Sequence, residues 1–151
     1  MNTLEVLRKS DLCRDLNDEQ LRVVEKMCTP CVFESGAIIC KQDTKLDRLY
    51  VIEEGLVGLI LELGPLSERQ VQAASDFETF GWSAVIAPHI STGTVKALEK
   101  TKVLAFNGNE LCDLCLTHPE IGYKIGRAIA RIVAARLHSA YVQLLGVTYQ
   151  D

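Results

Sequence analysis

The sequence predicts an α+β domain in which a run of short strands is flanked by helices at both ends of the chain. Apolar residues recur at helical spacing before residue 28 and after residue 109, and short apolar runs separated by turn residues fill the interval between them. The 151 residues suffice for one hydrophobic core but hardly for two. Strands that follow one another in this way pack on each other as a barrel or sandwich.

Composition argues against several classes of function. The formal net charge is −4 and the isoelectric point is near 5.4, whereas broad nucleic-acid binding requires Lys and Arg to neutralise phosphates. No apolar run approaches the length that crosses a bilayer, and the N-terminus lacks the apolar centre of a signal peptide. We therefore expect a cytoplasmic protein with neither a membrane nor a nucleic acid among its partners.

The N-terminal segment, residues 1–30, is predicted to be helical. Asn17 and Gln20 have the spacing of a capping box, in which each side chain binds a backbone N–H of the other residue. Apolar residues follow at helical spacing at positions 21, 24 and 27. Pro30 is expected to end this helix.

The middle segment, residues 31–108, is predicted to hold the strands. Glu34-Ser35-Gly36 is a turn sequence, and Gly55 and Gly64-Pro65 mark bends. The predicted strands are residues 37–40, 49–52, 56–63, 69–74, 94–98 and 102–106.

The C-terminal segment, residues 109–151, is predicted to form two helices. Asn109 can cap a short helix that holds Leu111, Leu114 and Cys115. Thr117 and Glu120 have capping-box spacing for a second helix that runs to about residue 145, where Gly146 can close it. That helix would be roughly 39 Å long at 1.5 Å per residue, too long to lie wholly against so small a body.

The stretch from Phe80 to Ala97 separates the two groups of strands. It opens with Phe80-Gly81, allows a short helix before Pro88 and closes on a β-branched strand start at Thr94. A glycine followed by a short helix leaves backbone N–H groups unpaired, which suits an anion such as phosphate. Taken alone, the same pattern fits a tight turn that joins two strands.

These residues resemble the cyclic-nucleotide-binding domain, the effector module of catabolite-activator-type regulators, kinase regulatory subunits and gated channels. The spacing of Gly36, Ile39, Gln42, Asp47, Tyr50-Val51-Ile52, Gly55 and Val57 follows the family pattern without a gap. Phe80-Gly81 and Thr94-Val95-x-Ala97 fall where the phosphate-binding cassette, residues 80–97, begins and ends. The resemblance implies an eight-stranded antiparallel jelly-roll barrel with N-terminal helices, one short cassette helix and two C-terminal helices that act as hinge and lid.

Two departures from the family pattern remove charge from the cassette. The resemblance implies a glutamate for the ribose hydroxyl at position 82 and an arginine for the cyclic phosphate at position 91, but the chain has Trp82 and Ser91. A lost charge-assisted hydrogen bond costs about 1.5–3 kcal/mol, or roughly ten- to hundredfold in affinity. We therefore expect weak binding of cyclic AMP. Asp43 and Leu46 replace family glycines, so that turn is expected to differ in detail.

Three interpretations of the pocket follow. The pocket could hold a different small, nucleotide-like effector with Trp82 stacked on its ring, or it could hold a cyclic nucleotide weakly. In the third interpretation Trp82 fills the pocket, and the protein is a ligand-free scaffold. A guanidinium from the long helix, such as that of Arg127 or Arg131, would restore the missing charge. Tyr141 is the lid candidate. The predicted ligand-binding residues are Gly81, Trp82, Ser83, Ala84, Ser91, Thr92 and Thr94.

The cysteines offer an alternative from another class of function. Cys28 and Cys31 form one CxxC pair, and Cys112 and Cys115 form a second. In the family fold the first strand lies antiparallel to the last, so these four thiols could meet in a metal or redox site, with Cys112 activated in the first turn of a helix. Buried thiols also behave as small hydrophobes, the interpretation we prefer for all six, Cys13 and Cys40 included.

The long helix carries a stripe of small residues, Gly122, Gly126, Ala130 and Ala134, beside broad apolar area. One side is expected to cover the barrel and the other to pair with a second copy of the chain, although both could pack within one chain. No catalytic motif is present: the three histidines show no ligand spacing, and there is no nucleophile–base pair or nucleotide loop.

The prediction is therefore a single domain over residues 1–151, a non-enzymatic regulator that signals through its C-terminal helix to a homodimer partner or another protein. The chain ends where activator-type regulators begin their helix-turn-helix, so we expect no DNA-binding domain. No cofactor beyond the small effector is expected.

Overall fold

The N-terminal segment forms two helices rather than one. In the computed structural model, which describes residues 1–149 and side chains as far as residue 146, these are α1 (Thr3–Lys9) and α2 (Asp18–Glu25). The predicted capping box is present, because Asn17 Oδ1 accepts from the N–H of Gln20 at 2.8 Å and Gln20 Oε1 accepts from the N–H of Asn17 at 3.0 Å. The prediction that Pro30 ends this helix is wrong, since α2 stops at Glu25 and Pro30 lies inside a strand.

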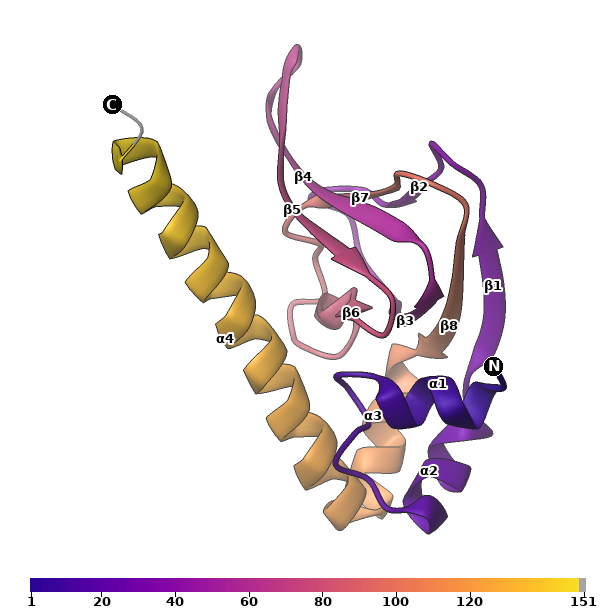
Figure 1. The fold of residues 1–151 in the computed structure, drawn as a ribbon. Helices are drawn as coiled ribbons and strands as arrows, with labels where there is room; N and C mark the ends of the chain where they lie inside the picture. The colour runs from indigo at the N-terminus through magenta and orange to yellow at the C-terminus, as the bar shows by residue number, and fades with distance from the viewer. Residues whose placement is uncertain (150–151) are drawn as a thin grey trace.

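Eight strands form two four-stranded sheets in which every neighbouring pair is antiparallel. The first sheet has the order β1-β8-β3-β6 and the second the order β2-β7-β4-β5. This is the eight-stranded jelly-roll arrangement that the resemblance implies (Figure 1). The strands are β1 (Thr29–Phe33), β2 (Ile38–Cys40), β3 (Arg48–Glu54), β4 (Leu56–Gly64), β5 (Ser67–Ser75), β6 (Thr79–Phe80), β7 (Thr94–Ala97) and β8 (Thr101–Asn107).

Two of these strands have no counterpart among the segments predicted from apolar runs. Strand β1 pairs only with β8 and lies at the edge of its sheet, where a proline that lacks an N–H is tolerated. Strand β6 contains two residues, too few for any alternation. Phe80 of this short strand is nonetheless fully buried and stacks on Tyr50, with 5.0 Å between the ring centroids.

Two helices complete the chain, α3 (Gly108–Thr117) and α4 (Pro119–Tyr149). The cap of α3 is Asn107, whose Oδ1 accepts from the N–H of Glu110 at 3.0 Å, and the prediction of Asn109 is wrong because α3 begins one residue before it. The predicted capping box of α4 is also wrong: the Thr117 hydroxyl donates to carbonyls at the end of α3 instead.

Helix α4 is one continuous element of 31 residues, about 46 Å long. It passes through Gly146 without ending there, contrary to the prediction, and diverges from the strands toward its C-terminus (Figure 1). The last two residues of the predicted segment 109–151 lie outside the part that the structure describes. Within residues 1–149, no helix is both long and apolar enough to cross a bilayer.

The start of α3 touches the cassette directly. Gly108 donates its N–H to the carbonyl of Asp47 at 2.9 Å. A Cβ atom at Gly108 would lie 2.3 Å from the carbonyl oxygen of Ala84, a backbone atom that cannot simply turn aside. Only glycine therefore lets α3 begin this close to the cassette helix.

We predict that Gly108→Ala lowers the free energy of unfolding by about 1–3 kcal/mol, because the new methyl group must push α3 and the cassette apart. Urea denaturation measures this change. The matched control is Gly146→Ala, also in a helix, where an added Cβ meets no atom within 4 Å and helix propensity favours alanine. Equal stability of Gly108→Ala and the wild-type protein would contradict the close contact.

Candidate ligand-binding site

The cassette turns sharply where β6 ends. Gly81 has a φ of 83°, in the left-handed region, and a Cβ atom there would lie 2.9 Å from the carbonyl oxygen of Arg48. A single 3₁₀ turn, η1 (Trp82–Ala84), follows. The chain then returns through a cis Ala87–Pro88 bond and His89, at a φ of 65°, into β7. The short helix predicted before Pro88 is thus one turn.

Polar contacts on two sides hold the start of the cassette in place. Asp11, which follows α1, accepts a hydrogen bond from the Thr79 hydroxyl at 2.5 Å and one from the Thr79 N–H at 3.3 Å. Burial raises the pKa of Asp11, and the two hydrogen bonds from Thr79 act in the opposite direction. On the other side, Nδ1 of His89 lies 3.0 Å from the carbonyl oxygen of Ser83. The N-terminal segment and the cassette loop therefore both fix the position of η1.

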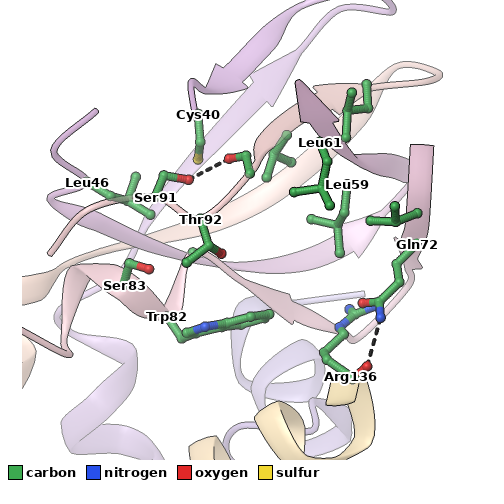
Figure 2. A pocket seen from close by; sticks show the side chains of 15 residues that line it. Cys40, Leu46, Leu59, Leu61, Gln72, Trp82, Ser83, Ser91, Thr92 and Arg136 are labelled. Carbon is green, nitrogen blue, oxygen red and sulfur yellow. Dashed lines mark hydrogen bonds between the residues drawn. The ribbon is translucent and has the colours of Figure 1, made fainter. Parts of the chain in front are cut away.

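A cavity of about 150 Å³ lies between the cassette and the second sheet (Figure 2). The cassette contributes one wall, and strands of the second sheet contribute an apolar wall opposite it. The apolar residues of these strands are Cys40, Leu59, Ile60, Leu61, Val71 and Val95, and Leu46 of the loop between β2 and β3 joins them. Trp82 lines this cavity and leaves it open.

Five of the seven predicted ligand-binding residues line the cavity: Gly81, Trp82, Ser83, Ser91 and Thr92. Ala84 and Thr94 are not among the lining residues, and each is only 3% exposed. Ala84 packs under the first residue of α3, and the Thr94 hydroxyl accepts from the N–H of Gln42 at 3.0 Å. Both therefore support the site from behind. The lid candidate Tyr141 is 54% exposed and does not line the cavity.

Ser91 occupies the position at which the resemblance implies an arginine. It is buried, and its hydroxyl donates to the carbonyl of Gly93 at 2.6 Å, as the dashed line in Figure 2 shows. The Ser91 hydroxyl therefore already donates its proton within the loop. It can offer a ligand only its oxygen, as a weak hydrogen-bond acceptor. The cassette wall of the cavity carries no charged side chain.

The charged side chain of this cavity comes from α4. Arg136 lines it with a side chain that is only 15% exposed. Its Nη1 donates to the carbonyl of Ala73 at 3.0 Å, and its Nη2 lies 3.9 Å from Oε2 of Glu78. The Gln72 side chain donates in turn to the carbonyl of Arg136 at 2.8 Å (Figure 2).

The two arginines of the long helix named above as examples of a replacement charge, Arg127 and Arg131, do not line the cavity. Arg131 pairs with Asp15, and Nη1 of Arg127 donates to the Tyr123 hydroxyl at 3.1 Å, so neither is a cavity residue. The local sequence around Arg136 does not distinguish it from Arg127 and Arg131. Its place in the cavity depends on the angle at which α4 crosses β5. Gln143, one of the next polar residues along α4, also donates to a carbonyl of β5, that of Val71.

The thiols are placed apart from this site, except for Cys40 in its wall. Burial raises the pKa of Cys28 to about 11, that of Cys13 to about 12 and that of Cys40 to about 12. Cys112 lies in the second turn of α3, not the first as predicted, because α3 begins at Gly108. Among the residues whose placement is described, no three His, Cys, Asp or Glu side chains gather as a metal site would require.

Comparisons with known proteins agree with this architecture. A protein of Rhodopseudomonas palustris that is named as a proposed potassium channel is 27% identical over 113 residues, 75% of this chain but 27% of that protein. The chain thus spans about a quarter of the length of this relative.

Two solved structures have the same fold. A proposed cyclic nucleotide-binding protein from Geobacter metallireducens has a TM-score of 0.79 and 28% identity, with 91% of this chain and all of that chain covered. The catabolite activator protein of Thermus thermophilus has a TM-score of 0.76 at 21% identity, with 93% of this chain and 64% of that chain covered.

The sequence profile of the cyclic nucleotide-binding domain matches residues 30–118, more than half of the chain. The matched range contains the whole cassette and all eight strands, except for Thr29, the first residue of β1. The protein described here belongs to the cyclic nucleotide-binding domain family.

Proposed function

We propose that this protein is a non-enzymatic regulatory module that binds a small effector beside the cassette and does not bind cyclic AMP tightly. The observation that carries the proposal is the cassette wall itself, which has a preserved Gly81 turn but Trp82 and Ser91 in place of its two charged groups. A cyclic phosphate at the cassette would meet neutral cassette groups, and the Ser91 hydroxyl already donates to the Gly93 carbonyl. The one charged residue among the described lining residues, Arg136, comes from α4 and donates to the Ala73 carbonyl of β5 instead. The sugar would meet an indole where a carboxylate is needed.

The open cavity favours an effector module over a ligand-free scaffold. If Trp82 filled the pocket, no lined space would remain, whereas about 150 Å³ lies beside the indole.

Helix α4 supports the regulatory part of the proposal. It contributes Arg136 to the cavity and also extends beyond the strands, so a ligand that changes the contact of Arg136 with β5 would shift the population of α4 positions.

A second copy of the chain is the proposed partner of α4. An open apolar groove of about 1160 Å³ runs along α4 between α3 and the cassette. Gly122 lies in it but serves packing within the chain, because a Cβ there would lie 2.5 Å from the carbonyl oxygen of Cys115. Gly126 meets nothing within 4 Å, and Ala130 and Ala134 are exposed. Three of the four stripe residues thus leave room for a symmetry-related helix.

No observation favours the alternative of a thiol or metal sensor. The raised pKa of Cys28 keeps its thiol protonated near neutral pH, where reactive thiols are thiolates. Within the described residues, no group of three His, Cys, Asp or Glu side chains could hold a metal ion.

Restoring the two charges should restore nucleotide binding. We predict that the double variant Trp82→Glu/Ser91→Arg binds cyclic AMP at least about tenfold tighter than the wild-type protein, because it regains an ionic partner for the phosphate and an acceptor for the ribose. Calorimetric titration with cyclic AMP and cyclic GMP measures the change.

The control for this experiment is Trp82→Gln/Ser91→Gln, which removes the indole in the same way and places a larger polar side chain at position 91 but adds no charge. Submicromolar binding of either nucleotide by the wild-type protein would contradict the proposal. Mass spectrometry of small molecules released from freshly purified protein gives an independent view of what the cavity holds.

A charge in the groove should break the proposed dimer. We predict that Ala134→Glu shifts the protein from dimer to monomer in sedimentation velocity, because a desolvated carboxylate would face apolar side chains. Ala135→Glu is the matched control, since Ala135 is exposed on the same helix but does not line the groove. A monomeric wild-type protein, or equal effects of both variants, would exclude this interface.

The cysteines provide a further check. At neutral pH a thiol with a pKa near 11 is about one ten-thousandth thiolate, so we predict that Cys28 reacts with thiol reagents far more slowly in the folded protein than in denaturant. The rate should rise as the pH approaches 11. Peptide mapping after timed alkylation identifies the residue, and rapid labelling of Cys28 at neutral pH would revive the redox alternative.

A further inference from the structure

We propose that the effector of this cavity is a compact monocarboxylate with an aromatic or similarly flat apolar body, whose carboxylate pairs with Arg136. This inference rests on the proposed function and specifies its ligand. It combines three properties of the cavity, namely its size, the chemistry of its walls and the unequal distribution of charge around it.

Size limits the body of the ligand. The cavity measures about 150 Å³, and apolar cavities of roughly that volume in proteins accommodate a benzene-sized molecule. A purine, a ribose and a cyclic phosphate together exceed this space while the Trp82 indole forms part of the wall. A single ring with a short polar group fits, provided that the polar group reaches Arg136.

The walls favour a flat apolar body. Aliphatic side chains of three strands, among them Leu59, Val71 and Val95, face the cassette across the cavity. On the cassette side Trp82 offers an indole, which prefers an offset or edge-on arrangement with another ring. The hydroxyl groups of Ser83 and Thr92 are the neutral polar groups beside it. A sugar would leave most of its hydroxyl groups unpaired against the aliphatic wall.

The charge distribution favours an anion at one end. Among the lining residues Arg136 is the one charged side chain, and no acidic residue lines the cavity. Within the described residues its one hydrogen-bond acceptor is the neutral carbonyl of Ala73. Glu78 lies 3.9 Å away, and its other carboxylate oxygen already accepts from the N–H and hydroxyl of Ser75. The guanidinium is thus nearly buried and incompletely paired.

A carboxylate satisfies this guanidinium better than any neutral group does. Guanidinium and carboxylate match in a planar, bidentate geometry, and the pair strengthens where water is scarce. Because Arg136 belongs to α4 and bonds to β5, a carboxylate that competes with Ala73 would also loosen α4 from that strand. Ligand binding and movement of α4 would then be the same event.

The test compares two molecules of equal shape. Benzoate and benzamide differ chiefly in charge, and calorimetric titration or ligand-observed NMR measures both on the wild-type protein. We expect benzoate to bind at least about tenfold tighter than benzamide. Acetate, which has the charge without the ring, should bind far more weakly than benzoate. Equal affinities for benzoate and benzamide, or no binding of benzoate, would overturn the inference.

Variants assign the effect to one side chain. Arg136→Gln should abolish the preference for benzoate over benzamide, whereas Arg127→Gln should retain it, because Arg127 is exposed on the same helix and contacts Tyr123 instead. If Arg136→Gln does not fold, the comparison of the two probes on the wild-type protein still decides. If benzoate does not bind, this inference fails but the proposed effector role does not. That role is tested separately by mass spectrometry of the small molecules released from the purified protein. Submicromolar binding of cyclic AMP would overturn both.

Discussion

The outer edge of β5 determines where α4 lies, and both the candidate site and the proposed dimer surface depend on that position. An edge strand leaves carbonyl and N–H groups without partners in its sheet. Here the carbonyls of Val71 and Ala73 accept from Gln143 and Arg136, and Gln72 donates back to a carbonyl of α4. One side of the helix therefore contributes Arg136 to the cavity, while its other side lines the apolar groove with α3.

Local signals in the sequence predicted most of the fold. The capping box of Asn17 and Gln20 needs only two residues three apart, and the long strands β3, β4 and β8 display apolar runs between turns. The elements that were missed lack such signals. Strand β1 is an exposed edge strand with a proline in it, and β6 is two residues long. The cap of α3 was misplaced because Asn107 and Asn109 both precede its apolar residues, and only the end of β8 distinguishes them.

The candidate site was predictable where it is contiguous in the chain. The cassette turn, and five of the residues that line the cavity, follow from the stretch between Phe80 and Ala97. Ala84 and Thr94 belong to the same stretch but face other partners, which depends on the packing of α3 and of the loop at Gln42. Arg136 could not be found in this way, because it is 54 positions from Trp82 and reaches the cavity only through tertiary contact.

The close contact of Gly122 with the backbone of Cys115 fixes the N-terminal end of α4 against α3. From Gly122 to Arg136 the helix rises about 21 Å, and to its last described residue about 40 Å, at 1.5 Å per residue. A rigid rod anchored at its base magnifies motion in proportion to distance, so any sideways step of Arg136 is nearly doubled at the tip. In the proposed regulator, a small displacement of Arg136 would therefore give a displacement nearly twice as large at the far end of α4.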